Sequence, residues 1–224
     1  MINEILWILT LMLSFLLIIF CYKYFGKSGL FLWVVVATIV SNIQTVKVVE
    51  LFGIETSLGT ILYGSTFLAT DILNYKYGVK ESRKTIIYGF LAMIILTLFM
   101  AICLIYTPSA NDFAQESLTT IFSINIRITI ASLLGFGVSQ FIDSWLFDKL
   151  QKKYNKIWLS NNFSTMFCQV IDTIIFCLIT YYGTMDFSII LEIMISMYIL
   201  KFVIALFDTP FMYLAMKIKK VKND

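Results

Sequence analysis

The 224-residue sequence contains no histidine, and this absence removes several classes of chemistry at once. Without imidazole the chain cannot carry histidine-based acid–base catalysis, a histidine-activated nucleophile or a histidine metal site. The net charge of +3 is also too small for a nucleic-acid-binding protein, so we expect no directly bound nucleic acid. Hydrolases, zinc enzymes and DNA-binding proteins are excluded, and we do not expect an enzyme.

Cysteine is scarce as well, and its spacing argues against a metal or redox site. The four cysteines, Cys21, Cys103, Cys168 and Cys177, lie in apolar stretches, and no pair has C-x-x-C spacing. We therefore expect buried thiols, no metal and no cofactor. The N-terminus has no Lys or Arg before its apolar run, so we expect the first segment to remain as a helix rather than be cleaved as a signal peptide.

Charged residues make up only 14% of the chain, whereas 59% of its residues are hydrophobic and 16% are aromatic. The mean hydropathy is +0.86, and soluble domains usually contain about 45–50% apolar residues. The length accommodates about seven spans of roughly 20 residues each. We expect an all-α fold, a polytopic transmembrane helical bundle forming one integral membrane domain over residues 1–224.

Seven apolar runs are the candidate spans. They cover residues 5–22, 29–52, 57–74, 85–106, 121–147, 158–182 and 187–214. The third run contains glycines, serine, threonines and Asp71. It is therefore either a short span or a re-entrant segment, which would leave six spans.

Basic residues gather after the first, third, fifth and seventh runs, whereas the other connections carry acidic residues. The basic clusters are Lys23 and Lys27; Lys76, Lys80, Arg83 and Lys84; Lys149, Lys152, Lys153 and Lys156; and Lys217, Lys219, Lys220 and Lys222. By the positive-inside rule, seven spans then place the N-terminus outside and the C-terminus in the cytoplasm. Removing the third span would put basic clusters on both sides, which counts against the re-entrant alternative.

Several ionisable residues lie inside the predicted spans, where a charge at the helix centre costs about 2.5–3.5 kcal/mol. They are Lys47, Asp71, Arg127, Asp143, Asp172, Glu192, Lys201 and Asp208. Such residues normally face a cavity or an ionic partner and mark a transport pathway. Lys47 is the exception, because Glu50 lies three residues away near an expected helix end, where an ion pair or snorkelling accounts for it.

Two of these aspartates belong to a local repeat with the pattern Q-x-I-D-[ST]-x-x-F. The two copies contain Gln140, Asp143 and Phe147, and Gln169, Asp172 and Phe176. On a helix, each copy places an amide, a carboxylate and an aromatic ring on one face, which suits a flat polar ligand. Because the two helices run antiparallel around a basic loop, we expect the two aspartates at similar depth.

Polar residues also occur in the last two runs. The stretch before Asp172 is too polar to face lipid, and it fits either a cavity lining or a tight helix interface. Its polar members are Asn161, Asn162, Ser164 and Thr165. In the seventh run, Lys201 and Asp208 lie seven residues apart on one face, and Pro210 is expected to kink the helix near Asp208.

Four stretches, in this order, resemble the queuosine precursor transporter family, also known as the YhhQ or VUT family of integral membrane proteins. They are YGSTFLATDILNYKYG (63–78), RITIASLLGFGVSQFIDSWLF (127–147), WLSNNFSTMFCQVIDTIIF (158–176) and KFVIALFDTP (201–210). The resemblance covers most of the chain from about residue 59. The sequence departs from the family pattern at Tyr75, where an acidic residue is typical, and at Ser160, where an arginine is typical.

The resemblance implies a membrane transporter that imports queuine or other deazaguanine bases, which the cell salvages to make the tRNA base queuosine. Carboxylates can accept the N–H donors of such a purine-like base, amides can bind its carbonyl, and aromatic rings can stack on its face. The site is expected between the third, fifth, sixth and seventh helices. The expected substrate-binding residues are Asp71, Asn74, Arg127, Gln140, Asp143, Phe147, Asn162, Ser164, Thr165, Gln169, Asp172, Phe176, Lys201 and Asp208.

A single small chain with positive-inside loops and no targeting sequence fits a multi-pass protein of the bacterial cytoplasmic membrane. Its expected surroundings are the lipid bilayer, and the sequence leaves open whether it forms a homodimer. One of the intramembrane aspartates could carry a proton during transport. Two alternatives stay open. The chain could be the substrate-binding subunit of an energy-coupling-factor importer for a vitamin-like molecule, because such subunits are small, helical and free of ATPase motifs. It could also be a non-transporting structural membrane protein, whose polar residues only lock its helices together.

Overall fold

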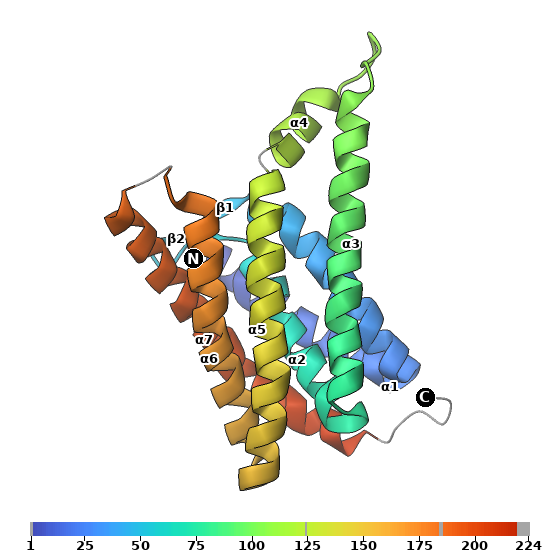
Figure 1. The fold of residues 1–224 in the computed structure, drawn as a ribbon, viewed down its shortest axis with the longest axis vertical. Helices are drawn as coiled ribbons and strands as arrows, with labels where there is room; N and C mark the ends of the chain where they lie inside the picture. Colours follow the sequence, from blue (N-terminus) through green and yellow to red (C-terminus); the bar gives the residue numbers. More distant parts are fainter. Residues whose placement is uncertain (1, 124, 184–185, 219–224) are drawn as a thin grey trace.

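The computed structural model describes residues 2–123, 125–183 and 186–218, in which helices predominate and one short hairpin is inserted (Figure 1). Lys219, Lys220 and Lys222 of the last basic cluster lie outside the described residues. In chain order the elements are α1 (Ile2–Thr45), β1 (Val48–Leu51), β2 (Ile54–Ser57), α2 (Thr60–Tyr77), α3 (Val79–Ile105), α4 (Gln115–Ser123), α5 (Asn125–Tyr154), α6 (Ile157–Tyr181) and α7 (Phe187–Lys217).

α1 consists of two helical arms that meet at Gly26, where the backbone (φ 56°, ψ −134°) is not helical. Glycine adopts this positive φ without the steric cost that a Cβ would impose. Gly29 allows the second arm to begin close to the first, because a Cβ on it would overlap the carbonyl oxygen of Cys21. The break falls between the first two predicted runs, so they form separate helical arms as expected.

The second predicted run is wrong at its end, because the helix stops at Thr45 and the chain then forms an antiparallel hairpin. β1 and β2 pair from Val48 with Ser57 to Leu51 with Ile54. The turn residues, Phe52 and Gly53, both have positive φ (53° and 78°), as in the two-residue turns that match the twist of paired strands. A short apolar run rich in valine does not distinguish strand from helix, and the run of 29–52 therefore extended the helix too far.

α2 lies inside the bundle, where most of its residues from Thr60 to Asn74 are buried against α1, α3, α5 and α7. It is one unbroken helix of 18 residues, about 27 Å long, and not a broken segment. Because neighbouring helices surround it, its glycines, hydroxyls and Asp71 need not face lipid.

The remaining long helices pack around α2 (Figure 1). α5 and α6 form an antiparallel pair with the most extensive contact in the bundle, α7 packs on α6 and α2, and α3 packs on α5, α1 and α2. The short helix α4 contacts the ends of α3 and α5. This arrangement brings one face each of α2, α5, α6 and α7 toward the middle of the molecule.

Five of the described helices are long and apolar enough to cross a membrane, namely α1, α3, α5 from Ile126, α6, and α7 from Ile190. Their outer surfaces expose many large apolar side chains, among them Leu13, Phe99 and Ile195. A soluble monomer rarely exposes extended apolar surfaces of this kind. The chain is therefore a helical membrane protein.

Contacts between elements place three of the basic clusters at one end of the bundle. Lys27, beside the break in α1, forms an ion pair with Glu81 near the start of α3 (3.5 Å). Lys76, near the end of α2, donates to the carbonyl oxygens of Met216 (2.8 Å) and Ile218 (2.9 Å) at the end of α7. The hairpin and α4 lie toward the other end (Figure 1). We call these two ends the basic end and the hairpin end.

Candidate substrate-binding site

A cavity lies between the helices, with Thr45 of α1 and Ser57 of the hairpin in its wall. Three residues that the sequence predicts for substrate binding line it: Asp172, Phe176 and Lys201. The rest of the wall combines hydroxyl and amide groups of α1 with aromatic, methionine and hydroxyl side chains of the other long helices.

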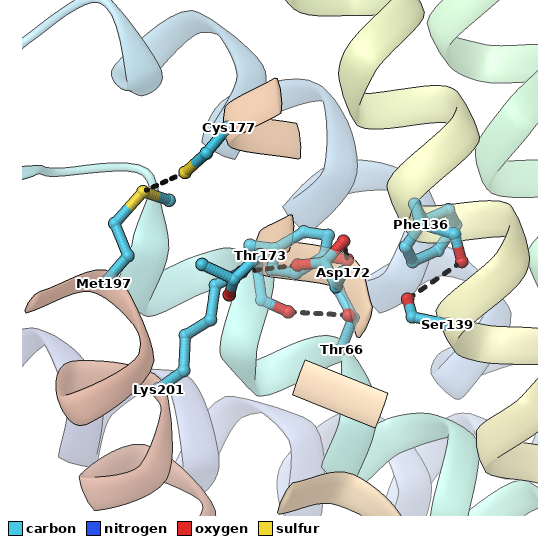
Figure 2. A network of polar contacts seen from close by, with 9 residues as sticks. Thr66, Phe136, Ser139, Asp172, Thr173, Cys177, Met197 and Lys201 are labelled. Carbon is cyan, nitrogen blue, oxygen red and sulfur yellow. Dashed lines mark hydrogen bonds and ion pairs between the residues drawn. The ribbon is translucent and has the colours of Figure 1, made fainter. Parts of the chain in front are cut away.

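Asp172 on α6 is the centre of the polar contacts in this cavity. The hydroxyl of Tyr63 on α2 donates to its Oδ1 (2.7 Å). Lys201 on α7 donates from Nζ to Oδ2 of Asp172 and to Oγ1 of Thr173 (3.1 Å), and Figure 2 shows the lysine extending toward both residues. The side chains of Asp172 and Lys201 are only 5% and 3% exposed. Each charge therefore depends on the other for its neutralisation.

The surrounding residues fit this ion pair closely. Gly135 on α5 faces the carboxylate, and a Cβ at that position would lie 2.9 Å from Oδ1 of Asp172. The ammonium group of Lys201 also lies 5.1 Å from the centre of the Tyr63 ring, a distance at which a cation is attracted to the ring face. Phe136 meets the Tyr63 ring edge-on, with centroids 5.8 Å apart. The cavity therefore presents a charged pair next to aromatic surfaces.

One face of the second arm of α1 supplies polar groups to the cavity. Its members are Thr38, Ser41, Asn42 and Thr45. The three hydroxyl groups donate to carbonyl oxygens one turn earlier in α1, at 2.6 to 3.0 Å. The amide of Asn42 is the group of this face that can both donate to and accept from a ligand.

The polar face of α1 was not among the predicted site residues, although the sequence carries a signal for it. The four residues occupy positions i, i+3, i+4 and i+7 of an otherwise apolar run, which is the spacing of one helix face. Tyr63 and Phe136 were also missed as site residues. They belong to stretches that carry the family resemblance, but single aromatic residues in a chain that is 16% aromatic give no distinctive signal.

A second polar layer lies closer to the basic end. On each of four helices it is offset from the first layer by seven or eight residues, or about 10 to 12 Å along the helix. The corresponding pairs are Tyr63 and Asp71 on α2, Phe136 and Asp143 on α5, Asp172 and Thr165 on α6, and Lys201 and Asp208 on α7. We call Tyr63, Phe136, Asp172 and Lys201, which line the cavity, the outer layer. We call Asp71, Asp143, Thr165 and Asp208 the inner layer. Asp143 and Asp172 therefore do not share a depth, and that prediction is wrong.

The inner layer gathers four of the predicted site residues, away from the cavity. Its three carboxylic acids, Asp71, Asp143 and Asp208, are at most 1% exposed. Asp71 and Asp143 interact electrostatically, and Oδ1 of Asp71 and both carboxyl oxygens of Asp143 have no hydrogen-bond partner within the described residues. Thr165 donates to Oδ2 of Asp71 at 3.5 Å.

A buried amide completes the inner layer. Asn161 on α6 donates from Nδ2 to Oδ1 of Asp208 on α7 (2.6 Å). The side-chain oxygen of Asn161 has no hydrogen-bond partner within the described part of the chain, although the residue is fully buried. The layer therefore joins α2, α5, α6 and α7 through acids and amides.

The two glutamines of the sequence repeat lie between the layers. Gln140 follows Phe136 by four residues and precedes Asp143 by three, and Gln169 lies three residues before Asp172. Both are buried. Neither amide atom of Gln140, nor Oε1 of Gln169, has a hydrogen-bond partner among the residues that the structure describes.

The other predicted site residues do not reach the cavity. The amide of Asn74 donates to the carbonyl oxygen of Ser144 (3.0 Å), which links α2 to α5. Asn162 donates to Oγ1 of Thr209 (2.6 Å), which links α6 to α7. Phe147 packs in the apolar core. These side chains hold the helices together around the site.

Arg127 also lies away from the cavity, at the hairpin end of α5. Its side chain donates to the carbonyl oxygens of Ile179 (2.7 Å) and Tyr182 (2.6 Å). Carbonyl groups at the end of a helix lack partners within the helix. The arginine therefore satisfies the last turn of α6 and ties it to α5.

Comparison with known families agrees with the fold and with the sequence motifs. The profile of the family described as putative vitamin uptake transporter matches residues 57–215. The chain belongs to this transporter family. The resemblance seen in the four motifs is thereby confirmed, and the chain is a multi-pass bacterial membrane protein of a transporter family rather than of an enzyme family.

Individual relatives carry a more specific description. A probable queuosine precursor transporter of Bacillus subtilis (strain 168) is 38% identical over 227 residues, covering 100% of this chain and 98% of that protein. The queuosine precursor transporter of Escherichia coli (strain K12) is 27% identical over 146 residues, covering 65% of this chain and 64% of that protein. A probable queuosine precursor transporter of Haemophilus influenzae is 28% identical over 135 residues, or 60% and 56% of the two chains. No solved structure matches the chain.

Proposed function

We propose that this protein imports queuosine precursors, queuine or another deazaguanine base, and that the cavity around Asp172 is where the base binds. The observation that carries the proposal is the buried carboxylate of Asp172 in the wall of a cavity, next to aromatic rings. The names of the relatives, in particular one that is 38% identical over the whole chain, support the same class of substrate.

The cavity offers a complementary group for each part of a deazaguanine. The ring N–H and amino groups of the base are donors that one carboxylate can accept side by side, and Asp172 is the acid in the cavity wall. Lys201 and Asn42 can donate to the carbonyl oxygen of the base. Phe136 and Phe176 line the cavity as apolar ring surfaces against which the flat base can stack.

Binding of the base would exchange partners at Asp172. The ammonium group of Lys201 occupies the carboxylate in the absence of substrate, which removes the cost of an unpaired buried charge. When the N–H donors of the base reach Asp172, Lys201 can turn toward the carbonyl oxygen of the same base. The pair of Asp172 and Lys201 stays neutral overall, so neither the empty nor the occupied site contains an unpaired buried charge.

The direction of transport follows from the proposed topology. With seven spans and the N-terminus outside, the hairpin end faces the exterior and the basic end faces the cytoplasm. The cavity wall includes Ser57 and Gly59 beside the hairpin, so the cavity lies on the side from which an external base would arrive. The whole chain, 1–224, acts as one transporter domain in the lipid bilayer.

The experiment that tests the proposal measures tRNA queuosine in cells that can neither make nor import the base. Queuine or a precursor is supplied outside, and the cells express this protein or the Asp172→Asn variant. We expect the protein to restore the modification and the variant to fail. The matched control is Asp148→Asn, the same chemical change at a partly exposed residue that pairs with Lys152 (2.7 Å) at the basic end.

Absence of restoration by any compound, with the protein present in the membrane, would contradict the proposal. If an added set of ATPase subunits then restored the modification, the chain would instead be the substrate-binding subunit of an energy-coupling-factor importer.

A further inference from the structure

The inner layer contains three buried aspartates, and within the described residues no basic side chain forms an ion pair with them. Asp71, Asp143 and Asp208 come from three helices and are at most 1% exposed. Within the described residues, the buried ion pair of the bundle joins Lys201 to Asp172 in the outer layer, and no ion pair reaches the three inner aspartates. Three ionised carboxylates in a water-poor interior without a cation would repel one another strongly.

The proximity of Asp71 and Asp143 suggests how this charge is reduced. Two ionised carboxylates that interact electrostatically repel each other, and three of the four carboxyl oxygens accept no hydrogen bond from the described residues. Because an ionised carboxylate can only accept a hydrogen bond, a proton on one of the two groups removes the repulsion and supplies a donor. Pairs of buried carboxyl groups that share a proton in this way behave as one titrating unit.

The unpartnered amides indicate that a polar ligand reaches this region. Both amide atoms of Gln140, between the layers, and the side-chain oxygen of Asn161, within the inner layer, have no hydrogen-bond partner in the described chain, although both residues are fully buried. Buried amides are normally satisfied by protein or by water. Their position is therefore suited to a chain of water molecules that carries a proton between the outer and the inner layer.

We propose that the carboxyl pair of Asp71 and Asp143 binds the proton whose entry drives import of the substrate. The proposal rests on the proposed function and adds to it a second ligand, the proton, with its own site. Asp172 is excluded from this role because Lys201 and Tyr63 already neutralise and bind its carboxylate.

The other titratable groups that face the pair are few. Asp208 approaches from α7 and Cys168 from α6, and both interact electrostatically with the pair. Asp208 is bound by Asn161. From α3, Ser82 contributes only a hydroxyl, which bonds Ser144 next to Asp143 (3.1 Å). Within the part of the chain that the structure describes, no basic side chain forms an ion pair with either member of the pair.

The structure also separates the proton site from the substrate site. Phe67 on α2 and Ile204 on α7 lie between the layers, and both are at most 1% exposed. α2 and α7 pack tightly here, because a Cβ on Gly64 would lie 2.9 Å from Cγ2 of Ile204. Since α2 and α7 each carry residues of both layers, a shift of these helices when the base binds would move Asp71 and Asp208 together.

The test uses the purified full chain in proteoliposomes with labelled queuine, with the membrane potential clamped at zero. If one proton accompanies each substrate molecule, one pH unit of inward proton gradient supports about tenfold accumulation. We expect that accumulation in the wild-type protein, and a ratio near one for Asp71→Asn and Asp143→Asn. Exchange of external for internal queuine should persist in both variants, because exchange needs no net proton movement. Asp172→Asn should lose accumulation and exchange alike.

Three outcomes would overturn the proposal. They are full accumulation by both inner-layer variants, accumulation that follows a sodium gradient instead of the pH gradient, and loss of exchange together with accumulation in folded inner-layer variants. Asp148→Asn serves as the matched control and should accumulate queuine normally. A wild-type protein that neither accumulates nor exchanges queuine would instead contradict the proposed function itself.

A second measurement uses only the wild-type protein, so it does not depend on whether the variants fold. With a pH-sensitive dye inside the vesicles, queuine added to the wild-type protein without an imposed gradient should acidify the interior. An interior pH that stays constant during measured uptake would refute proton coupling without any variant.

Discussion

The buried ion pair of Asp172 and Lys201 allows stability and substrate binding to be separated by three variants. Asp172→Asn and Lys201→Met each remove one charge, and the double variant removes both. Removing one partner of a buried pair costs about 3–5 kcal/mol, because the other charge is left unpaired in the interior. Here the two side chains are 5% and 3% exposed, so we expect each single variant to lose a stability of that order and the double variant to recover most of it.

Substrate affinity should follow a different pattern from stability. A hydrogen bond to a charged group contributes about 1.5–3 kcal/mol, which corresponds to a roughly 10- to 150-fold change in Kd. Because Asp172 is the proposed acceptor for the base, its loss should weaken queuine binding by at least this factor. The double variant should stay weak although its stability is restored, since it still lacks the carboxylate.

The assay combines thermal unfolding in detergent with calorimetric titration of queuine on the same four proteins. The matched control is the surface pair of Asp148 and Lys152, which are 33% and 76% exposed and should contribute no more than about 1 kcal/mol. Removing either control residue should change neither quantity appreciably. The reasoning would be refuted if the double variant bound queuine like the wild type, or if the single variants unfolded like the surface controls.

Three further predictions concern residues around the cavity. Tyr63→Phe removes the hydroxyl donor to Asp172 and should raise the KM for queuine uptake roughly tenfold; an unchanged KM would show that this hydrogen bond does not orient the carboxylate. Asn42→Leu should reduce queuine affinity in calorimetry, whereas Ile43→Ala on the exposed side of the same helix should not; equal effects would remove Asn42 from the site. Arg127→Met should lower the unfolding temperature without changing the KM, because its guanidinium donates to backbone carbonyls at the end of α6, away from the cavity.

The fold could be predicted well where apolar runs are long, and poorly where they are short. The long runs after residue 85 correspond to α3, α5, α6 and α7. The run of 29–52 could not be divided, because valines near Thr45 fit helix and strand equally, and only the turn at Phe52 and Gly53 decides. α2 was uncertain because its polar residues contradict a lipid-facing span, and only its place inside the bundle resolves that contradiction.

The chemistry of the site could be anticipated, but its geometry could not. Burial of charge singled out Asp172 and Lys201 as residues that need partners, and they prove to be partners of each other. The separation of Asp143 from Asp172 depends on where α5 ends and α6 begins, and errors of roughly 2–4 residues at each of these boundaries add up to about two helical turns. The sequence therefore predicts a polar interior, and the structure divides it into two layers.

Transport by this chain alone is tested by the initial rate of labelled queuine uptake into liposomes that contain no other protein. We predict saturable uptake without ATP. We also predict that unlabelled deazaguanine bases compete for uptake and that Asp172→Asn abolishes it, while Asp148→Asn transports at the wild-type rate. Uptake indistinguishable from that of empty liposomes would contradict transport by this chain, and full uptake by Asp172→Asn would contradict binding of the base at Asp172.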